Sequence, residues 1–228
     1  MLKSLLLLAV TILFSMATNS ECAQGDQLIK EKCESCHAFV KPEKSDLSRF
    51  LNRKGQDLYW AGSKYNQDWL IRWLQAPSRI RPSGAYNFTH LSANAGEAAS
   101  GEAMKSDHIR LSKEEAEAVT EQMMKLTAPA DVVEAGIYKP GSATPEDGAP
   151  LFITMRGCGS CHMWAPGKGG RSSAELYTGG ERMKADYIAS YINNPPKFDA
   201  GAWMPRQMFS DSEIQKFTAF ILSLGNKK

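Results

Sequence analysis

The sequence contains the pentapeptides CESCH at residues 33–37 and CGSCH at residues 158–162, two copies of a pattern in which a pair of cysteines is followed directly by a histidine. These pairs hold all but one of the 5 cysteines in the 228-residue chain; the other, Cys22, lies near the N-terminus. Such a pair could form a disulfide, a redox-active dithiol or half of a zinc site. The histidine after each pair favours a further interpretation.

The pattern C-x-x-C-H is the attachment signature of c-type haem. Two thiols on one helical turn can add to the two vinyl groups of a porphyrin, and the next residue then lies beneath the ring, where its imidazole can bind the iron. A zinc site or dithiol would leave both histidines without a role. We therefore expect two haem c groups. The predicted attachment residues are Cys33, Cys36, Cys158 and Cys161, and the predicted proximal iron ligands are His37 and His162.

Residues 1–23 have the layout of a secretory signal. Lys3 supplies a positive charge, an uncharged apolar run extends from Leu5 to Met16, and polar and small residues lead to Ala23. The apolar run is shorter than the roughly 20 residues that span a bilayer. We expect a signal peptide over 1–23, with its cleavage site undetermined, and a periplasmic protein. An uncleaved anchor that keeps the protein membrane-associated is the alternative.

The composition indicates a packed protein without a nucleic-acid partner. Hydrophobic residues make up 43% of the chain and charged residues 23%, a balance that allows a sizeable core and does not indicate disorder. The formal net charge is only +2 at pH 7, too small for the electrostatic attraction on which nucleic-acid binding depends. We therefore expect no nucleic-acid partner.

A second repeated segment follows each motif. Residues 62–77 align with residues 180–195 without a gap, and both segments end in proline, which cannot continue the hydrogen-bond ladder of a helix. Aromatic residues four positions apart, on one face of a helix, occupy matching places: Trp69 and Trp73 in the first segment, Tyr187 and Tyr191 in the second. We expect each segment to form an aromatic helix that ends at its proline.

A third match lies at the end of each copy. Ser112 and Ser210 are each followed three residues later by glutamate, the pattern of a capping box at the start of a helix. Apolar residues then recur at helical spacing: Val119, Met123 and Leu126 in the first copy, Phe217, Ile221 and Leu224 in the second. We expect these two helices to bury that face against the helix that carries the C-x-x-C-H motif.

Each copy thus has a helix ending at C-x-x-C-H, a loop, an aromatic helix ending at proline, a second loop and a capped final helix. This order resembles the class I cytochrome c fold, present twice, and the resemblance covers nearly all of the chain after the signal. It implies an all-α protein with two tandem cytochrome c-like domains, each wrapped around one covalent haem. We expect these domains at 24–128 and 148–228, joined by a linker over 129–147, where prolines interrupt any helical pattern.

In the family that the chain resembles, a methionine in the loop before the last helix usually supplies the second axial ligand of the iron, often within Met-Pro. The second copy has Met204 followed by Pro205 in this loop. A thioether suits haem iron and raises its potential. The resemblance therefore favours Met204 as the ligand of the second haem, with Met208 and Met183 as alternatives.

The second ligand of the first haem is left open by the sequence. The loop between Pro77 and Ser112 is longer than its counterpart and contains no Met-Pro. Met104 lies at a distance before the capping serine that many class I cytochromes show for their methionine. His108 is an alternative, since imidazole also binds iron and lowers its potential, and His90 lies further upstream. We favour Met104, with His108 as the alternative.

The resemblance implies that the protein transfers electrons between redox partners. Irons with two protein ligands have no open position for a substrate, so we expect an electron carrier without catalytic residues or a small-molecule substrate. The donor and acceptor are redox proteins, among which a membrane-bound respiratory complex is a candidate. One alternative is a haem subunit of a larger respiratory oxidoreductase. A less favoured alternative is a dihaem peroxidase or dehydrogenase with one open iron site.

Overall fold

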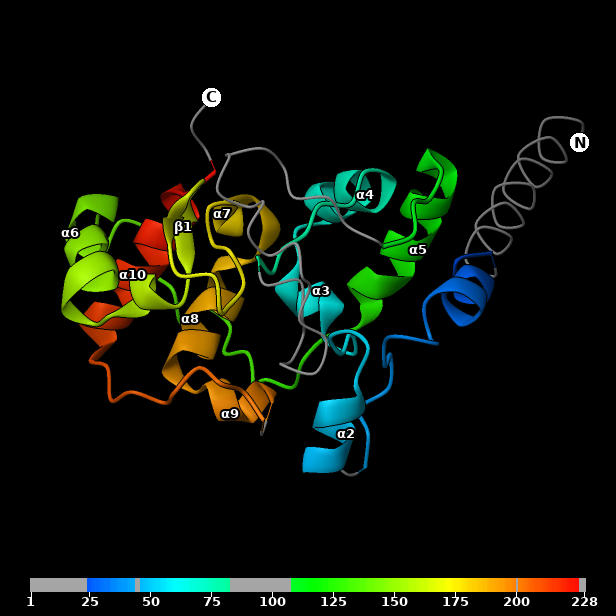
Figure 1. The fold of residues 1–228 in the computed structure, drawn as a ribbon, viewed down its shortest axis with the longest axis horizontal. Coiled ribbons are helices and arrows are strands. Elements are labelled where there is room, and N and C mark those ends of the chain that lie inside the picture. The colour runs from blue at the N-terminus through cyan, green and yellow to red at the C-terminus, as the bar shows by residue number, and fades with distance from the viewer. Residues whose placement is uncertain (1–23, 44–45, 83–107, 200, 226–228) are drawn as a thin grey trace, which may run out of the picture.

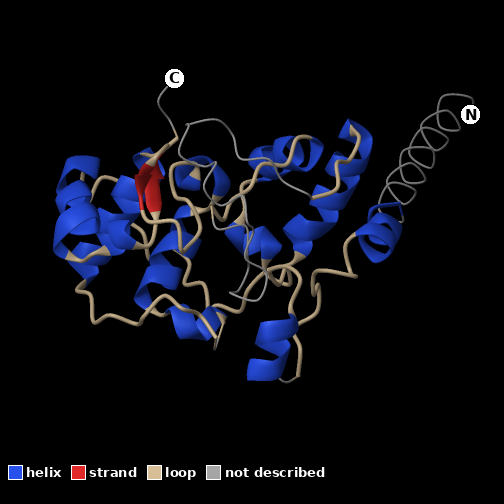
Figure 2. Ribbon diagram, viewed as in Figure 1, coloured by secondary structure: helices blue, strands red, loops and turns tan. Residues whose placement is uncertain are grey.

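A computed structural model describes residues 24–43, 46–82, 108–199 and 201–225. These residues are mostly helical, with a single small hairpin among them (Figure 2). None of the described helices is long and apolar enough to cross a membrane. The helices form two groups that follow one another along the chain and lie at opposite ends of the view in Figure 1.

The first group, here called the N-terminal repeat (residues 24–125), begins with helical residues 24–32, which lead directly into the first C-x-x-C-H motif. Its further helices are α2 (Leu47–Asn52), α3 (Ala61–Lys64), α4 (Gln67–Gln75) and α5 (Lys113–Lys125). One hydrophobic core joins the first helix to α3, α4 and α5; it includes Leu28, Ile29, Trp69, Leu70 and Val119.

The second group, the C-terminal repeat (residues 145–225), again has a motif-bearing first helix, a two-part aromatic helix and a capped final helix, with further elements between them. It begins with α6 (Pro145–Pro150), the π-helical turn η3 (Leu151–Met155) and the 3-10 turn η4 (Cys158–Ser160). A hairpin of β1 (Met163–Ala165) and β2 (Lys168–Gly169) follows, which the sequence patterns did not indicate. The remaining helices are α7 (Gly179–Arg182), α8 (Ala185–Asn193), α9 (Pro195–Phe198) and α10 (Asp211–Ser223).

The crossing of the first and last helices is the same in both repeats and depends on glycine. A Cβ atom at Gly25 would lie 2.5 Å from the carbonyl oxygen of Ala118, and one at Gly148 would lie 2.1 Å from that of Lys216. Both carbonyls belong to the final helix of their repeat. Only a residue without a side chain lets the two backbones come this close. The expected packing of the motif-bearing helix on the final helix is therefore present in each repeat.

The helix starts expected at the serines are confirmed. Ser112 and Ser210 each accept a hydrogen bond from the backbone N–H of the glutamate three residues on, and each glutamate side chain returns to the serine N–H. A third capping box opens α6, between Thr144 and Asp147. This helix begins inside the stretch that we expected to be linker, because Pro145 is tolerated at the first position of a helix.

The expected aromatic helices differ in one respect: each is broken after its first turn. Tyr65 separates α3 from α4, and Met183 separates α7 from α8. These two residues form an antiparallel bridge with each other, and they occupy equivalent positions in the sequence repeat. Hydrogen bonds from Asn66 N–H to Arg182 O (3.0 Å) and from Lys184 N–H to Lys64 O (2.9 Å) complete what we call the inter-repeat bridge. The break gives these backbone groups a partner in the other repeat.

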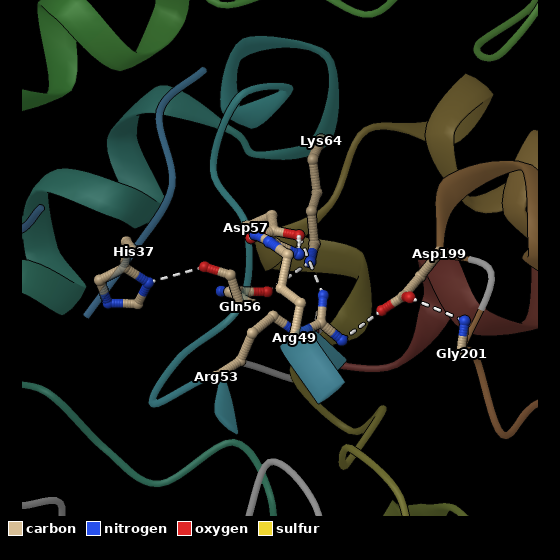
Figure 3. Close-up of polar contacts among 8 residues, drawn as sticks. All are labelled: His37, Arg49, Arg53, Gln56, Asp57, Lys64, Asp199 and Gly201. Carbon is tan, nitrogen blue, oxygen red and sulfur yellow. Dashed lines mark hydrogen bonds and ion pairs between the residues drawn. The ribbon is translucent and has the colours of Figure 1, made fainter. Parts of the chain in front are cut away.

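Side chains extend the contact between the repeats. The ring of Trp60 packs edge-on against Phe198, with centroids 5.7 Å apart. Arg53, whose side chain is only 7% exposed, bonds to Asp199 at 2.6 Å and to Asp57 at 2.9 Å (Figure 3). Asp199 in turn accepts the backbone N–H of Gly201 at 3.0 Å. The ion pair therefore joins the residue that follows α2 in one repeat to the loop that precedes Met204 in the other.

We predict that Gly148→Ala destabilises the protein by about 1–3 kcal/mol, the cost of overpacking a tight contact. Alanine normally stabilises a helix relative to glycine, so the sign of the change tests the crossing itself. Urea unfolding measures the change. Thr154→Ala, at an exposed position of η3, is the control and should leave the free energy of unfolding nearly unchanged. A more stable Gly148→Ala protein would contradict the close approach to α10.

We also predict that Asp199→Asn lowers the free energy of unfolding by about 2 kcal/mol, because Arg53 loses one charged partner while keeping Asp57. Lys113→Ala is the control, since it removes only an exposed pair with Glu117 and should change the free energy of unfolding by less than about 1 kcal/mol. Equal losses in the two variants would show that the Arg53–Asp199 pair adds nothing beyond a surface ion pair.

Candidate functional site

The first C-x-x-C-H motif forms one turn at the end of helical residues 24–32. The backbone N–H groups of Cys36 and His37 both donate to the carbonyl of Cys33, at 3.1 and 3.0 Å. Cys33 is buried and Cys36 is exposed. Burial raises the pKa of the Cys33 thiol to about 11, so the neutral thiol is the favoured form at neutral pH.

The second motif repeats this turn. The N–H groups of Cys161 and His162 both donate to the carbonyl of Cys158, at 3.1 and 3.0 Å. The turn begins at Gly157, whose φ of 71° lies in the left-handed region that favours glycine. Burial raises the pKa of Cys158, as it does that of Cys33. No disulfide joins any of these four motif cysteines.

Both motif histidines are held in the same way. The Nδ1 atom of His37 lies 2.8 Å from the carbonyl oxygen of Gln56, and that of His162 lies 2.7 Å from the carbonyl oxygen of Ala174. A carbonyl can only accept, so each Nδ1 carries the proton and each Nε2 keeps its lone pair. Burial lowers the pKa of both imidazoles. A neutral, oriented imidazole with a free Nε2 is the form that binds a metal ion.

The close approach of Gly55 fixes the His37 ring from one side. A Cβ atom at Gly55 would lie 2.6 Å from Cε1 of the imidazole, so a larger residue there would displace the ring. His37 also lines a cavity of about 40 Å³.

The lining of this cavity is mostly apolar, as a porphyrin requires. Its aliphatic and thioether residues are Leu58, Leu70, Leu74, Ile80 and Met123, its aromatic residues are Tyr65, Trp69 and Trp73, and Cys33, His37, Gln56 and His108 complete it. An attachment cysteine and its histidine thus lie at the wall of a largely apolar cavity. These residues fit a covalently attached haem.

The residues considered for the second ligand of the first haem divide into two sets. His108 lies in the wall of the cavity, with its ring centroid 6.1 Å from that of His37. Met104 and His90 lie outside the described residues. The structure therefore bears on only one of the three.

The three methionines considered for the second haem have different surroundings. Met204 is partly buried and packs against the core of the C-terminal repeat. Met208 is 98% exposed, and Met183 is buried within that core and takes part in the inter-repeat bridge. Of the three, Met204 combines contact with the core and partial exposure in the loop before α10.

A polar network joins the His37 site to the contact between the repeats (Figure 3). The Gln56 side chain accepts a hydrogen bond from Lys64 at 2.7 Å and bonds to the hydroxyl of Tyr65. Burial and the positive charges of Arg182 and Arg81 lower the pKa of Lys64 to about 7. An anion placed here would be favoured, and haem carries two carboxylates. The network therefore also fits a haem.

Sequence reasoning missed these supporting groups. Gln56 and Ala174 act through their backbone carbonyls, which leave no trace in residue type. Lys64 did carry a signal, because the repeat aligns it with the equally basic Arg182. Arg182 is buried in an ion pair with Glu175 at 3.1 Å, each side chain 3% exposed.

The two motifs do not combine into one metal site. Within residues 24–43, 46–82, 108–199 and 201–225, no three His, Cys, Asp or Glu side chains are placed to share a metal ion. A zinc site built from both cysteine pairs would need such a group. Each motif therefore belongs to its own repeat.

Comparison with known proteins identifies a family for part of the chain. Residues 145–225 match the family model described as cytochrome c. No curated protein and no solved structure matches the chain. The match begins where α6 begins and includes Cys158, Cys161 and His162. The C-terminal repeat is therefore a cytochrome c domain, which implies at least one haem c and an electron-transfer function with redox protein partners.

Proposed function

We propose that the protein is a dihaem cytochrome c that is exported to the periplasm and transfers electrons between redox partners. One observation carries the proposal: the backbone turn of C-x-x-C-H and the bond from histidine Nδ1 to a carbonyl are the same in the cytochrome c domain and in the N-terminal repeat. Two sites with the same backbone turn and the same histidine contact are best explained by two bound haems.

The N-terminal repeat supports a haem of its own on independent grounds. It has the glycine crossing, the capped final helix and an apolar cavity at His37. We accordingly propose two cytochrome c-like domains, at 24–128 and 148–228, with 129–147 between them. Thioether bonds from Cys33 and Cys36 would hold the first haem, and bonds from Cys158 and Cys161 the second.

The chemistry that haem supplies when bound is the gain and loss of one electron at iron. The chain's own residues set the conditions for it. His37 and His162 present Nε2 because their Nδ1 protons are committed to carbonyls. Leu70 and Leu74 keep the cavity wall apolar, and Lys64 would pair with a carboxylate of the bound haem. Met204 is the proposed second ligand at His162, and its thioether would raise the potential there.

Contacts between the repeats support electron transfer from one site to the other within the chain. The N–H of Glu175 donates to the carbonyl of Ile80 at 2.8 Å, and Ile80 lines the cavity at His37. Glu175 follows Ala174, the residue that holds His162. One short backbone contact therefore lies between residues that surround the two sites.

Export is proposed from residues 1–23 and agrees with the proposed chemistry. A haem that is bound through thioethers cannot dissociate into a large external volume, which suits a protein outside the cytoplasm. The partners are redox proteins, and a membrane-bound respiratory complex is a candidate among them.

We predict that the full chain, produced with a c-type haem maturation system, binds two haems per chain. The double variant Cys33→Ala/Cys36→Ala should retain one, and Cys158→Ala/Cys161→Ala should retain the other, because each haem needs its own pair of thiols. The haem-to-protein ratio measures this. Ser35→Ala and Ser160→Ala, within the motifs but outside the chemistry, are the matched controls and should keep two. A wild-type ratio of one would overturn the dihaem proposal.

We further predict that carbon monoxide leaves the optical spectrum of the dithionite-reduced protein unchanged, because two protein ligands occupy each iron. The measurement compares spectra before and after addition of the gas. A shift in half of the haem absorbance would identify one open iron and favour an enzyme or gas-binding protein over an electron carrier.

A further inference from the structure

The two histidine rings in the wall of the N-terminal cavity have the spacing of two ligands on one metal ion. The centroids of His37 and His108 are 6.1 Å apart. An imidazole nitrogen lies about 2 Å from a bound metal ion and about 1 Å from the centre of its own ring, so two imidazoles on opposite sides of a metal have centroids about 6 Å apart. The observed spacing has room for one iron between the rings.

The hydrogen bond of His108 prepares it for the same role as the motif histidines. Its Nδ1 lies 2.9 Å from the carbonyl oxygen of Ile109. This carbonyl can only accept, so Nδ1 carries the proton and Nε2 keeps its lone pair. His37 and His162 are held in this way by Gln56 and Ala174. A bond of this kind is what fixes the tautomer and direction of a metal-binding histidine.

The surroundings of His108 hold the ring in place. Trp73 lies against it with centroids 4.8 Å apart, and the Trp73 indole is itself fixed by donating to the carbonyl of Ser78 at 3.0 Å. The backbone N–H of Leu111 donates to the carbonyl of Leu74 at 3.0 Å, which ties the segment after His108 to the end of α4. An axial ligand needs this support, since its distance from the metal tolerates little movement.

The C-terminal repeat offers no counterpart. When the capping serines Ser112 and Ser210 are aligned, His108 falls on Arg206, which is exposed and is not a metal ligand. Met204 occupies the corresponding loop and packs against the core. The two repeats therefore share the motif histidine and differ in the residue that is available as the second iron ligand.

We propose that His108, and not a methionine, is the second axial ligand of the first haem, so that His37 and His108 hold this iron between two imidazoles. The proposal rests on the dihaem function proposed above. Imidazole gives haem iron a lower potential than a thioether does. The first site should therefore lose its electron more readily, and an electron should pass from the first site to the second, with one electron lost and one gained and no bond or proton changed.

The test uses ferric full-length protein with both haems attached. Near-infrared magnetic circular dichroism and electron paramagnetic resonance distinguish iron with two imidazole ligands from iron with imidazole and thioether. The wild-type protein should show both kinds in equal amounts. His108→Ala should abolish the signal of iron with two imidazole ligands and let carbon monoxide bind half of the reduced haem. Added imidazole should restore that signal. Met104→Leu is the matched control for the rival ligand and should retain both wild-type signals.

Three results would overturn the proposal: two haems of the imidazole–thioether kind in the wild-type protein, an unchanged spectrum in His108→Ala, or loss of a ligand signal in Met104→Leu. The wild-type spectrum tests the proposal by itself, even if His108→Ala does not fold. A wild-type protein with a single haem would instead refute the dihaem function, so the two failures can be told apart. A redox titration adds an independent readout, since His108→Met should raise the lower of the two potentials and leave the higher one in place.

Discussion

The close crossing of the first and last helices is the contact on which the rest of each repeat depends. Gly148 lies against the backbone of α10, and α6 runs on through η3 into the second motif. The position of Cys158 and His162 is therefore set by how closely two backbones approach some ten residues earlier. The same relation holds between Gly25, α5 and the first motif. A side chain at either glycine would move the motif relative to the wall of its own site.

Around this crossing, the supporting groups are mostly backbone. Carbonyls hold His37 and His162, backbone groups form the inter-repeat bridge, and a backbone contact between Ile80 and Glu175 links the two sites. Backbone groups keep their positions when side chains change rotamer, so they suit a site whose ligand must not shift as its charge changes. Charged side chains are used where the repeats meet, at Arg53 and Asp199.

Local sequence patterns predicted the parts of the structure that local chemistry determines. The capping serines start helices where expected, and the paired aromatic residues lie on α4 and α8. The break at Tyr65 and Met183 could not be predicted from one segment, because its cause is a partner in the other repeat. The start of α6 was missed because Pro145 was interpreted as a sign of linker and not as the first residue of a helix. For the second ligand of the first haem, spacing alone favoured Met104, while the contacts of His108 depend on how α4 and α5 pack, which spacing does not contain.

The inter-repeat bridge joins equivalent positions of the two repeats, and this has a consequence for the origin of the protein. A contact in which a surface meets its own counterpart is self-complementary, as in a dimer with two-fold symmetry. A single ancestral repeat with the edge at Tyr65 or Met183 could have paired with an identical copy before any covalent link existed. Gene duplication and fusion would then have made the dimer permanent. Once each half had its own coding sequence within the fused gene, the two halves could change independently, which two identical subunits cannot do.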